Sequence, residues 1–220
     1  MVRRIYLLIL TLLLTSRAPA QDHPQQECSI DGLDASHPTL FMVKAASTSG
    51  WQCYSNGKCS SFQIHRGDSI EVAHADQGWT CGYVTSAEGA GPEWVRSDAL
   101  SPVNADPNPP LSAWLGTWHG GEDLVHIQAS KTTGSLSISG TATWDGLNGN
   151  KHFGDIEGEV KAVGNKLHYT EGQGEYACAV DMTLIGDYIL ASDNQYCGGL
   201  NARFQGVWRR GNSLQRRASH

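Results

Sequence analysis

The side chains that could do chemistry are spread along the chain, and their spacing matches no local catalytic signature. A nucleophilic serine on a strand-to-helix turn would need Gly-x-Ser-x-Gly, which the sequence lacks. A zinc site on one helix face would need histidines three or four residues apart, and none of the nine histidines is so placed. His119, Glu122 and His126 flank an expected turn and could meet around a metal, but surface histidines are the commoner outcome. The sequence therefore favours a non-enzymatic protein with no cofactor and no metal. A hydrolase whose groups meet only in space stays open as an alternative.

Aromatic side chains are the more informative candidates for binding. Flat rings provide a large apolar area at a small cost in entropy, which suits recognition of extended peptides. Trp79 and Trp94 could serve equally well as core residues, whereas Tyr54 adjoins an Asn-Gly turn. The candidate binding residues are Tyr54, Trp79, Tyr83 and Trp94.

Residues 1–20 predict an export signal. Arg3 and Arg4 precede an apolar run over residues 5–14, and Ala18-Pro19-Ala20 provides the small residues that a signal peptidase reads. The run has about ten residues, whereas a spanning helix needs about 20. We therefore expect cleavage after Ala20, no membrane insertion after cleavage, and a periplasmic or secreted protein.

The charge of the chain restricts its partners. Removal of the signal takes away Arg3, Arg4 and Arg17 and changes the formal net charge from −6 to −9. Nucleic-acid binding needs a cationic surface, so we expect no nucleic-acid partner. Residues 211–220 form an expected basic tail, which we interpret as solvated.

Cysteine spacing suggests two separately closed domains. Six is an even number, and an exported protein meets an oxidising compartment in which cysteines pair. Cys178 and Cys197 are then expected to pair, and their loop of about 20 residues would contribute roughly 3 kcal/mol. The early group is expected to pair within itself, with three connectivities open; it contains Cys28, Cys53, Cys59 and Cys81.

A proline-rich segment marks the expected boundary between the two domains. Four prolines between Pro102 and Pro110 are incompatible with a helix or a central strand. Residues 104–112 therefore predict a semi-rigid linker. The N-terminal domain is expected over residues 28–103 and the C-terminal domain over residues 113–210.

Short strand-like runs alternate with turns in the N-terminal half, which predicts a small barrel or sandwich. Expected strands are Leu40–Ala45, Trp51–Tyr54, Ser69–His74 and Trp79–Val84. Gly67-Asp68, Gly78-Trp79 and Trp94-Val95 occur in the order typical of bacterial SH3-like domains, which residues 40–103 resemble. Glu93 departs from that pattern, because the family prefers glycine before the tryptophan. The resemblance implies a domain that binds peptides or cell-wall peptides.

Apolar and polar residues alternate with a period of two in the C-terminal half, as in strands with one buried face. Short connections favour an antiparallel meander that closes into a barrel. We expect eight strands, at 115–119, 123–129, 134–144, 154–162, 166–170, 175–184, 187–193 and 199–208. The predicted fold class is thus all-β, with a small SH3-like barrel followed by an eight-stranded antiparallel barrel.

Two further resemblances concern the C-terminal barrel. Gly116-Thr117-Trp118 on the first strand and Trp208-Arg209-Arg210 on the last resemble the calycin barrels, in which an arginine stacks on the first-strand tryptophan. The likeness implies that Trp118 and Arg209 close the barrel. A C-terminal module of lysozyme-inhibitor-like bacterial envelope proteins is similar to this chain in three segments, Tyr176–Cys178, Gly186–Leu190 and Cys197–Arg209.

These observations predict an exported binding protein of the bacterial cell envelope whose SH3-like module recognises peptide or peptidoglycan. One alternative is an inhibitor of lysozyme or another cell-wall hydrolase, because an acidic protein is steered toward a cationic enzyme. Another is a calycin-like barrel that holds a small ligand.

Overall fold

The computed structural model describes residues 24–30, 33, 38–86, 89–121, 123–146 and 149–211. The expected export signal, Glu122 and the basic tail beyond Gly211 lie outside the described residues. The described fold consists of two antiparallel sheets and includes two short 3-10 turns, Ser97–Ala99 and Leu111–Trp114. The all-β prediction is confirmed. Within these residues, no helix is long and apolar enough to cross a membrane.

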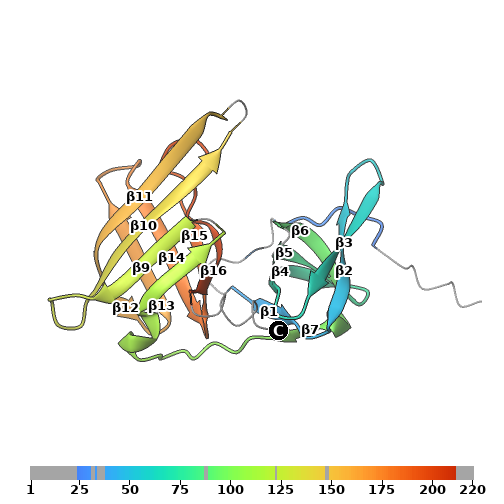
Figure 1. Ribbon diagram of the computed structural model, residues 1–220, viewed down its shortest axis with the longest axis horizontal. Helices are drawn as coiled ribbons and strands as arrows, with labels where there is room; N and C mark the ends of the chain where they lie inside the picture. The colour runs from blue at the N-terminus through green and yellow to red at the C-terminus, as the bar shows by residue number, and fades with distance from the viewer. Residues whose placement is uncertain are drawn as a thin grey trace, which may run out of the picture.

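The N-terminal sheet has seven strands in the order β3-β2-β6-β5-β4-β1-β7 (Figure 1). Three of the six neighbouring pairs, β2-β3, β4-β5 and β5-β6, are hairpins whose short turns enforce antiparallel pairing. The strands are β1 Leu40–Val43, β2 Ser47–Cys53, β3 Cys59–His65, β4 Ser69–Asp76, β5 Trp79–Thr85, β6 Ala90–Arg96 and β7 Leu100–Pro102.

This sheet buries both of its faces, because successive side chains along a strand point to opposite sides. One face encloses an aliphatic core that includes Ile70, Val84 and Val95. The other face carries Trp79 and Trp94, which pack beneath the segment that precedes the sheet. The Trp94 Nε1 donates a hydrogen bond to the backbone oxygen of Gln26 at 2.9 Å, and a disulfide holds the same segment in place.

Three disulfides close the chain in the two groups expected from the sequence, and no described cysteine is free. Cys28 bonds to Cys81 and Cys53 to Cys59, which resolves the three connectivities left open for the early group. Cys178 bonds to Cys197 in the C-terminal half. Disulfides persist in oxidising compartments, so the three bonds indicate an extracytoplasmic environment.

The C-terminal sheet is a nearly closed barrel of nine strands in the order β11-β10-β9-β8-β16-β15-β14-β13-β12 (Figure 1). The hairpin of β10 and β11 projects beyond the rest of the barrel. The strands are β8 Gly116–Gly120, β9 Asp123–Ala129, β10 Leu136–Asp145, β11 Lys151–Val160, β12 Ala162–Val163, β13 Lys166–Glu171, β14 Cys178–Ile185, β15 Tyr188–Asp193 and β16 Gly206–Arg210.

The prediction of eight strands was wrong by one, because one expected strand breaks at Lys161. β11 pairs with β10, whereas β12, one residue later, pairs with β13. The two end strands of the sheet, β11 and β12, are therefore consecutive in sequence. The break lets the chain bend across the gap between them, which is the seam of the barrel. Tyr169 bridges that seam, since its hydroxyl accepts a hydrogen bond from the Glu157 N–H at 3.1 Å. Residues 199–205, expected as strand, lie outside β16.

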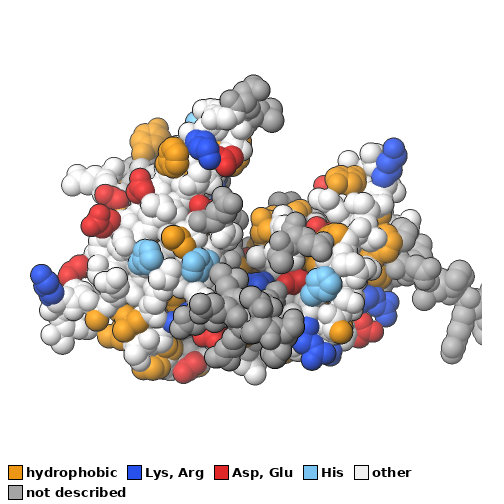
Figure 2. Space-filling model, viewed as in Figure 1, with side chains coloured by type: hydrophobic (Ala, Val, Ile, Leu, Met, Phe, Trp, Pro, Cys, Tyr) orange, Lys and Arg blue, Asp and Glu red, His pale blue; other side chains and the backbone are white. Residues whose placement is uncertain are grey.

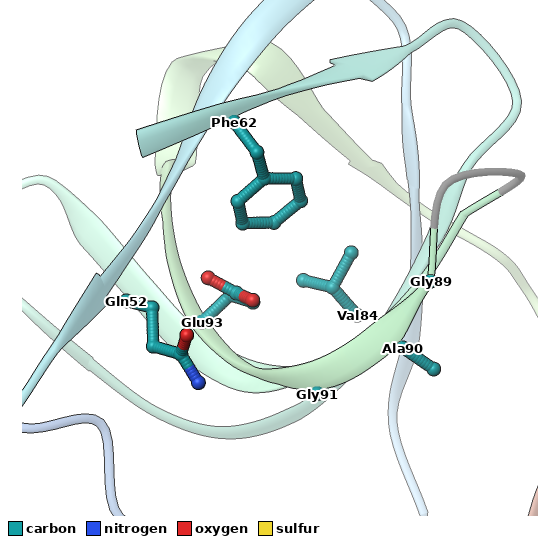
Figure 3. Close-up of a pocket in the computed structure, with 7 residues that line it drawn as sticks. All are labelled: Gln52, Phe62, Val84, Gly89, Ala90, Gly91 and Glu93. Atoms are coloured by element: carbon teal, nitrogen blue, oxygen red, sulfur yellow. The ribbon is translucent and has the colours of Figure 1, made fainter. Parts of the chain in front are cut away.

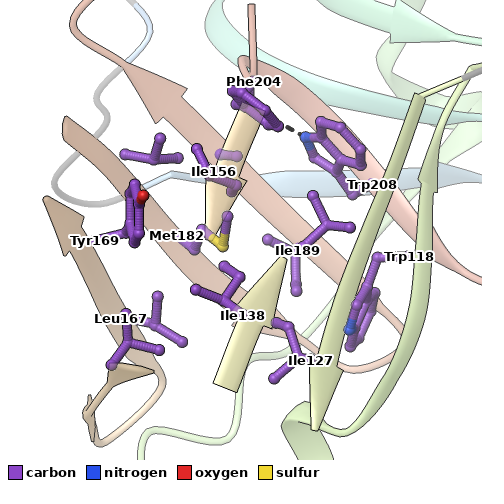
Figure 4. Packing of buried hydrophobic residues seen from close by; sticks show 14 of the residues in the cluster. Trp118, Ile127, Ile138, Ile156, Leu167, Tyr169, Met182, Ile189, Phe204 and Trp208 are labelled. Atoms are coloured by element: carbon purple, nitrogen blue, oxygen red, sulfur yellow. Dashed lines mark hydrogen bonds between the residues drawn. The ribbon is translucent and has the colours of Figure 1, made fainter. Parts of the chain in front are cut away.

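Twenty buried side chains occupy the barrel interior, among them Trp118, Ile138 and Phe204 (Figure 4). The arginine that covers Trp118 is Arg210, with its guanidinium carbon 4.2 Å from the ring centroid, and not Arg209 as expected. Strand parity explains the correction: Trp208 points inward, so Arg209 points outward and Arg210 inward again.

The outward face of β16 contacts the N-terminal sheet. Val207 packs in a small apolar cluster with Leu40 of β1. Arg209 donates a hydrogen bond from Nη2 to the Thr85 carbonyl oxygen at 2.9 Å and lies 3.3 Å from the Ser69 hydroxyl. These contacts join the two sheets at a buried, partly charged interface.

The proline-rich segment also lies against the barrel. The backbone N–H of Asn165, in the β12–β13 turn, donates to the Pro107 carbonyl oxygen at 3.1 Å. Gly164 has a φ of +60°, and a Cβ there would meet the Pro107 oxygen at 2.5 Å, so this contact requires glycine.

Candidate functional site

The structure does not gather the four candidate aromatic residues into one groove. Trp79 and Trp94 are 7% and 1% exposed and belong to the same buried cluster. Tyr83 is half-buried on β5, and burial raises the pKa of its hydroxyl. Tyr54 follows β2 and is 46% exposed. Of the four, Tyr54 therefore offers the most surface to a ligand.

A pocket of about 230 Å³ opens beside the aliphatic core of the N-terminal sheet, where β2 and β6 diverge. These strands pair at Gly50–Val95 and Trp51–Trp94, but the described residues Gln52 and Glu93 form no further pair. The side chains of Phe62, Val84 and Glu93 converge on this hollow (Figure 3). The lining residues are Gln52, Phe62, Val84, Gly89, Ala90, Gly91 and Glu93.

Glu93 is the unusual member of the pocket. Glu93 is 7% exposed, and its Oε2 is buried without a hydrogen-bond partner. Burial raises the pKa of its carboxyl group from 4.5 to about 7, because a low-dielectric site disfavours the charged form. A buried carboxyl group without a partner is costly for folding, and such groups concentrate at functional sites.

Local sequence explains how the pocket walls are placed. Strand alternation puts Trp94 on one face of β6 and Glu93 on the other. Phe62 lies directly over Gly50, where an added Cβ would come within 2.5 Å of the ring. Glycine on β2 therefore lets the ring lie flat against the sheet at the edge of the pocket.

Tyr54 is connected to the pocket through Gln52. The Tyr54 hydroxyl donates to the Gln52 Oε1 at 2.7 Å. The Gln52 amide oxygen can accept one further hydrogen bond and its NH₂ group can donate two, so both remain for a ligand. Glu93 adds an acceptor, or a donor when it is protonated. The pocket thus combines two polar anchors with an aromatic ring and the apolar Val84.

A second hollow lies on the barrel near β12, β13 and β14, and four of its polar side chains already contact one another. Lys166 Nζ donates to the Thr183 hydroxyl at 2.8 Å. His168 Nδ1 lies 2.7 Å from the Asp181 carboxylate. Because these four side chains contact one another, none of them needs a ligand as its polar partner.

The structure gives a polar partner to His126, one of the two histidines considered for a metal. His126 Nδ1 lies 3.0 Å from the Thr117 hydroxyl, and the described residues contain no group of three metal-ligating side chains.

Acidic and basic side chains are interspersed on the face seen in Figure 2, and neither sign gathers into a large patch there.

No family model, no curated protein and no solved structure matches the chain. The chemistry of the site therefore rests on its geometry. Sequence reasoning singled out Glu93 only as a departure from the SH3-like pattern. That departure was the signal in the sequence that could have pointed to the pocket. A carboxyl group next to a buried tryptophan, where the SH3-like pattern has glycine, is costly to bury and therefore needs an explanation.

Proposed function

We propose that the protein is an exported, non-enzymatic binding protein of the bacterial cell envelope and that its N-terminal sheet binds peptide or peptidoglycan. The observation that carries the proposal is the pocket beside Glu93, where a buried carboxyl group lacks a partner. A binding site bears the folding cost of such a group when a ligand supplies the missing hydrogen bond.

Two other features support this function. The three disulfides fit a protein that works outside the cytoplasm. The SH3-like order of motifs over residues 40–103 fits peptide recognition, and we propose that this sheet is an SH3-like domain and the barrel a calycin-like one. Twenty buried side chains occupy the barrel interior, which favours a role in protein or wall contacts over small-ligand storage.

Retention on purified peptidoglycan tests the proposal. Gly91→Leu places a side chain next to the Glu93 carboxylate, because a Cβ at this position would lie 3.7 Å from Oε1. We expect the native chain to sediment with peptidoglycan and this variant to lose at least tenfold in retention. Ser61→Leu, at an exposed position on β3 beside Phe62, is the matched control. Equal retention of the native chain and Gly91→Leu, or no retention of either, would contradict the proposal.

The inhibitor alternative rests on net charge and is examined in a separate assay. An acidic protein at −9 that blocks a cationic lysozyme should lose inhibition as salt screens the attraction. Absence of inhibition at micromolar protein would remove this alternative without affecting the binding proposal.

A further inference from the structure

We propose that the pocket beside Glu93 binds a protonated primary amine, with the Glu93 carboxylate as its counter-ion. The inference rests on the proposed function only for the source of the amine, which is a peptide side chain or a peptide N-terminus. Glu93 Oε2 is buried and without a hydrogen-bond partner. A cationic donor restores the hydrogen bond and the opposite charge together, which a neutral donor cannot do.

The other walls of the pocket suit an alkylammonium group. Phe62 offers an aromatic ring to the cation, and such contacts strengthen when water is excluded. Val84 provides apolar surface for the methylene stem that carries the amine. Neither lysine nor arginine is among the described lining residues, so the protein does not supply this cation itself.

The geometry also favours ammonium over guanidinium. Of the two Glu93 oxygens, Oε2 is the one that is fully buried without a partner, so a cationic donor has to reach into the pocket to meet it. An ammonium is a compact point charge that satisfies a single acceptor, whereas the planar guanidinium fork is matched by both oxygens of a carboxylate. The ligand chemistry is therefore a lysine-type side-chain amine or an α-amine, both of which are primary ammonium ions at neutral pH.

Protonation of Glu93 would compete with the amine. Gln52 of β2, Phe62 of β3 and Val84 of β5 face the pocket, and Glu93 of β6 is the only ionisable group among the described lining residues. Its pKa of about 7 means that the carboxylate form predominates at pH 8 and is scarce at pH 6. Amine affinity should therefore be about tenfold weaker at pH 6 than at pH 8.

A small probe tests the amine site without assuming any peptide. The Glu93 carboxyl carbon is followed by NMR in the full chain while n-butylammonium chloride is added, with 1-butanol as the neutral matched probe. We expect the amine to lower the pKa of Glu93 by about two units at saturation and the alcohol to leave it unchanged. An unchanged pKa at saturating amine, or the same change with 1-butanol, would overturn the proposal. Glu71→Gln, a neutralised carboxyl group on β4 outside the pocket, should respond to the amine as the native chain does.

Three synthetic peptides then identify the source of the amine. They share one sequence and carry a free lysine amine only, a free α-amine only, or neither, the blocked positions being acetylated. At pH 8 we expect one amine-bearing peptide to bind at least tenfold tighter than the fully acetylated peptide, and we expect Glu93→Gln to bring all three within twofold. Equal binding of all three to the native chain overturns the amine inference while leaving peptide binding intact. If no peptide binds but n-butylammonium still lowers the pKa of Glu93, the amine site is supported and the proposed peptide function fails.

Discussion

The two sheets enclose their interiors in different ways. The C-terminal barrel fills its interior with apolar side chains. The Trp118 Nε1 donates to the Trp114 carbonyl oxygen at 3.0 Å, and the buried polar atom left without a partner there is a neutral indole nitrogen, Trp114 Nε1. The N-terminal sheet ends its aliphatic core at a carboxyl group, Glu93, whose Oε2 has no partner. Both sheets are antiparallel and held by disulfides, so the difference lies in their interiors and not in their architecture.

This difference separates stability from function within one chain. A filled interior maximises the apolar area removed from water, whereas a buried carboxyl group without a partner destabilises the fold. We infer that the barrel provides most of the stability and that the N-terminal sheet gives up part of its stability for a binding pocket. Substitutions in each sheet should therefore change stability in opposite directions.

Trp118→Ala should produce the largest effect, a loss of about 3–5 kcal/mol in the free energy of unfolding. The indole is fully buried and lies beneath the Arg210 guanidinium, so its removal leaves a cavity and an unstacked cation. Urea unfolding followed by tryptophan fluorescence and circular dichroism measures the loss. Tyr196→Ala, at a residue 49% exposed, is the control and should cost less than about 1 kcal/mol.

Glu93→Gln should act in the opposite direction and stabilise the protein at high pH. The unfolded carboxyl group titrates near 4.5 and the folded one near 7. Between these values the folded state keeps a proton that the unfolded state has released, so the stability of the native chain falls as pH rises from 4.5 to 7 and then levels off. The variant removes this loss, which gives up to about 3 kcal/mol at pH 8 and no gain at pH 4.

Chemical denaturation of both chains at pH 4, 6 and 8 checks this sign. A variant that is less stable than the native chain at pH 8 would show that the Glu93 carboxylate is satisfied in the folded protein. The contrast drawn between the two interiors would then be wrong. Glu71→Gln neutralises a second, half-buried carboxyl group for comparison, because burial also raises the pKa of Glu71.

Arg209→Ala examines whether the two sheets unfold together. Its Nη2 reaches the Thr85 carbonyl oxygen at 2.9 Å across the interface, and a charge-assisted hydrogen bond of this kind contributes about 2 kcal/mol. We expect the native chain to unfold in a single calorimetric transition, and Arg209→Ala to broaden or split it, with the N-terminal sheet unfolding first. Lys151→Ala, which removes an exposed ion pair with Asp145, should leave one transition. An unchanged transition in Arg209→Ala would show that the apolar contacts alone couple the sheets.

Sequence patterns predicted the strands of the barrel better than the elements that join or interrupt them. Val180 and Met182 alternate with polar neighbours, and the strand that contains them is where the alternation indicated it. The break at Lys161 was missed because each side of it continues the same alternation while pairing with a different strand. Arg209 was assigned the stacking role of Arg210 because the motif does not fix which of two adjacent residues points inward.

The pocket could not be predicted from the sequence, and the reason is a different one. It exists because β2 and β6 diverge after Trp51 and Trp94, and the separation of two strands that are distant in sequence is a property of tertiary packing. Trp79 and Trp94 were candidate binding residues on their type alone, since nothing local distinguishes a buried tryptophan from an exposed one. Glu93 could be noticed as an exception, but its burial could not be derived.

Tyr54→Phe should have the smallest effect and would sharpen the description of the pocket. The substitution removes the hydroxyl that donates to the Gln52 oxygen, and because this hydrogen bond is exposed, stability should fall by less than about 1 kcal/mol. Gln52 then loses the contact that holds its amide, so peptide binding should weaken about twofold to threefold by isothermal calorimetry. Tyr176→Phe, on the barrel and 68% exposed, should change neither quantity. If Tyr54→Phe instead binds peptide as the native chain does, Gln52 does not need to be held, and the Glu93 carboxylate is the dominant polar anchor of the pocket.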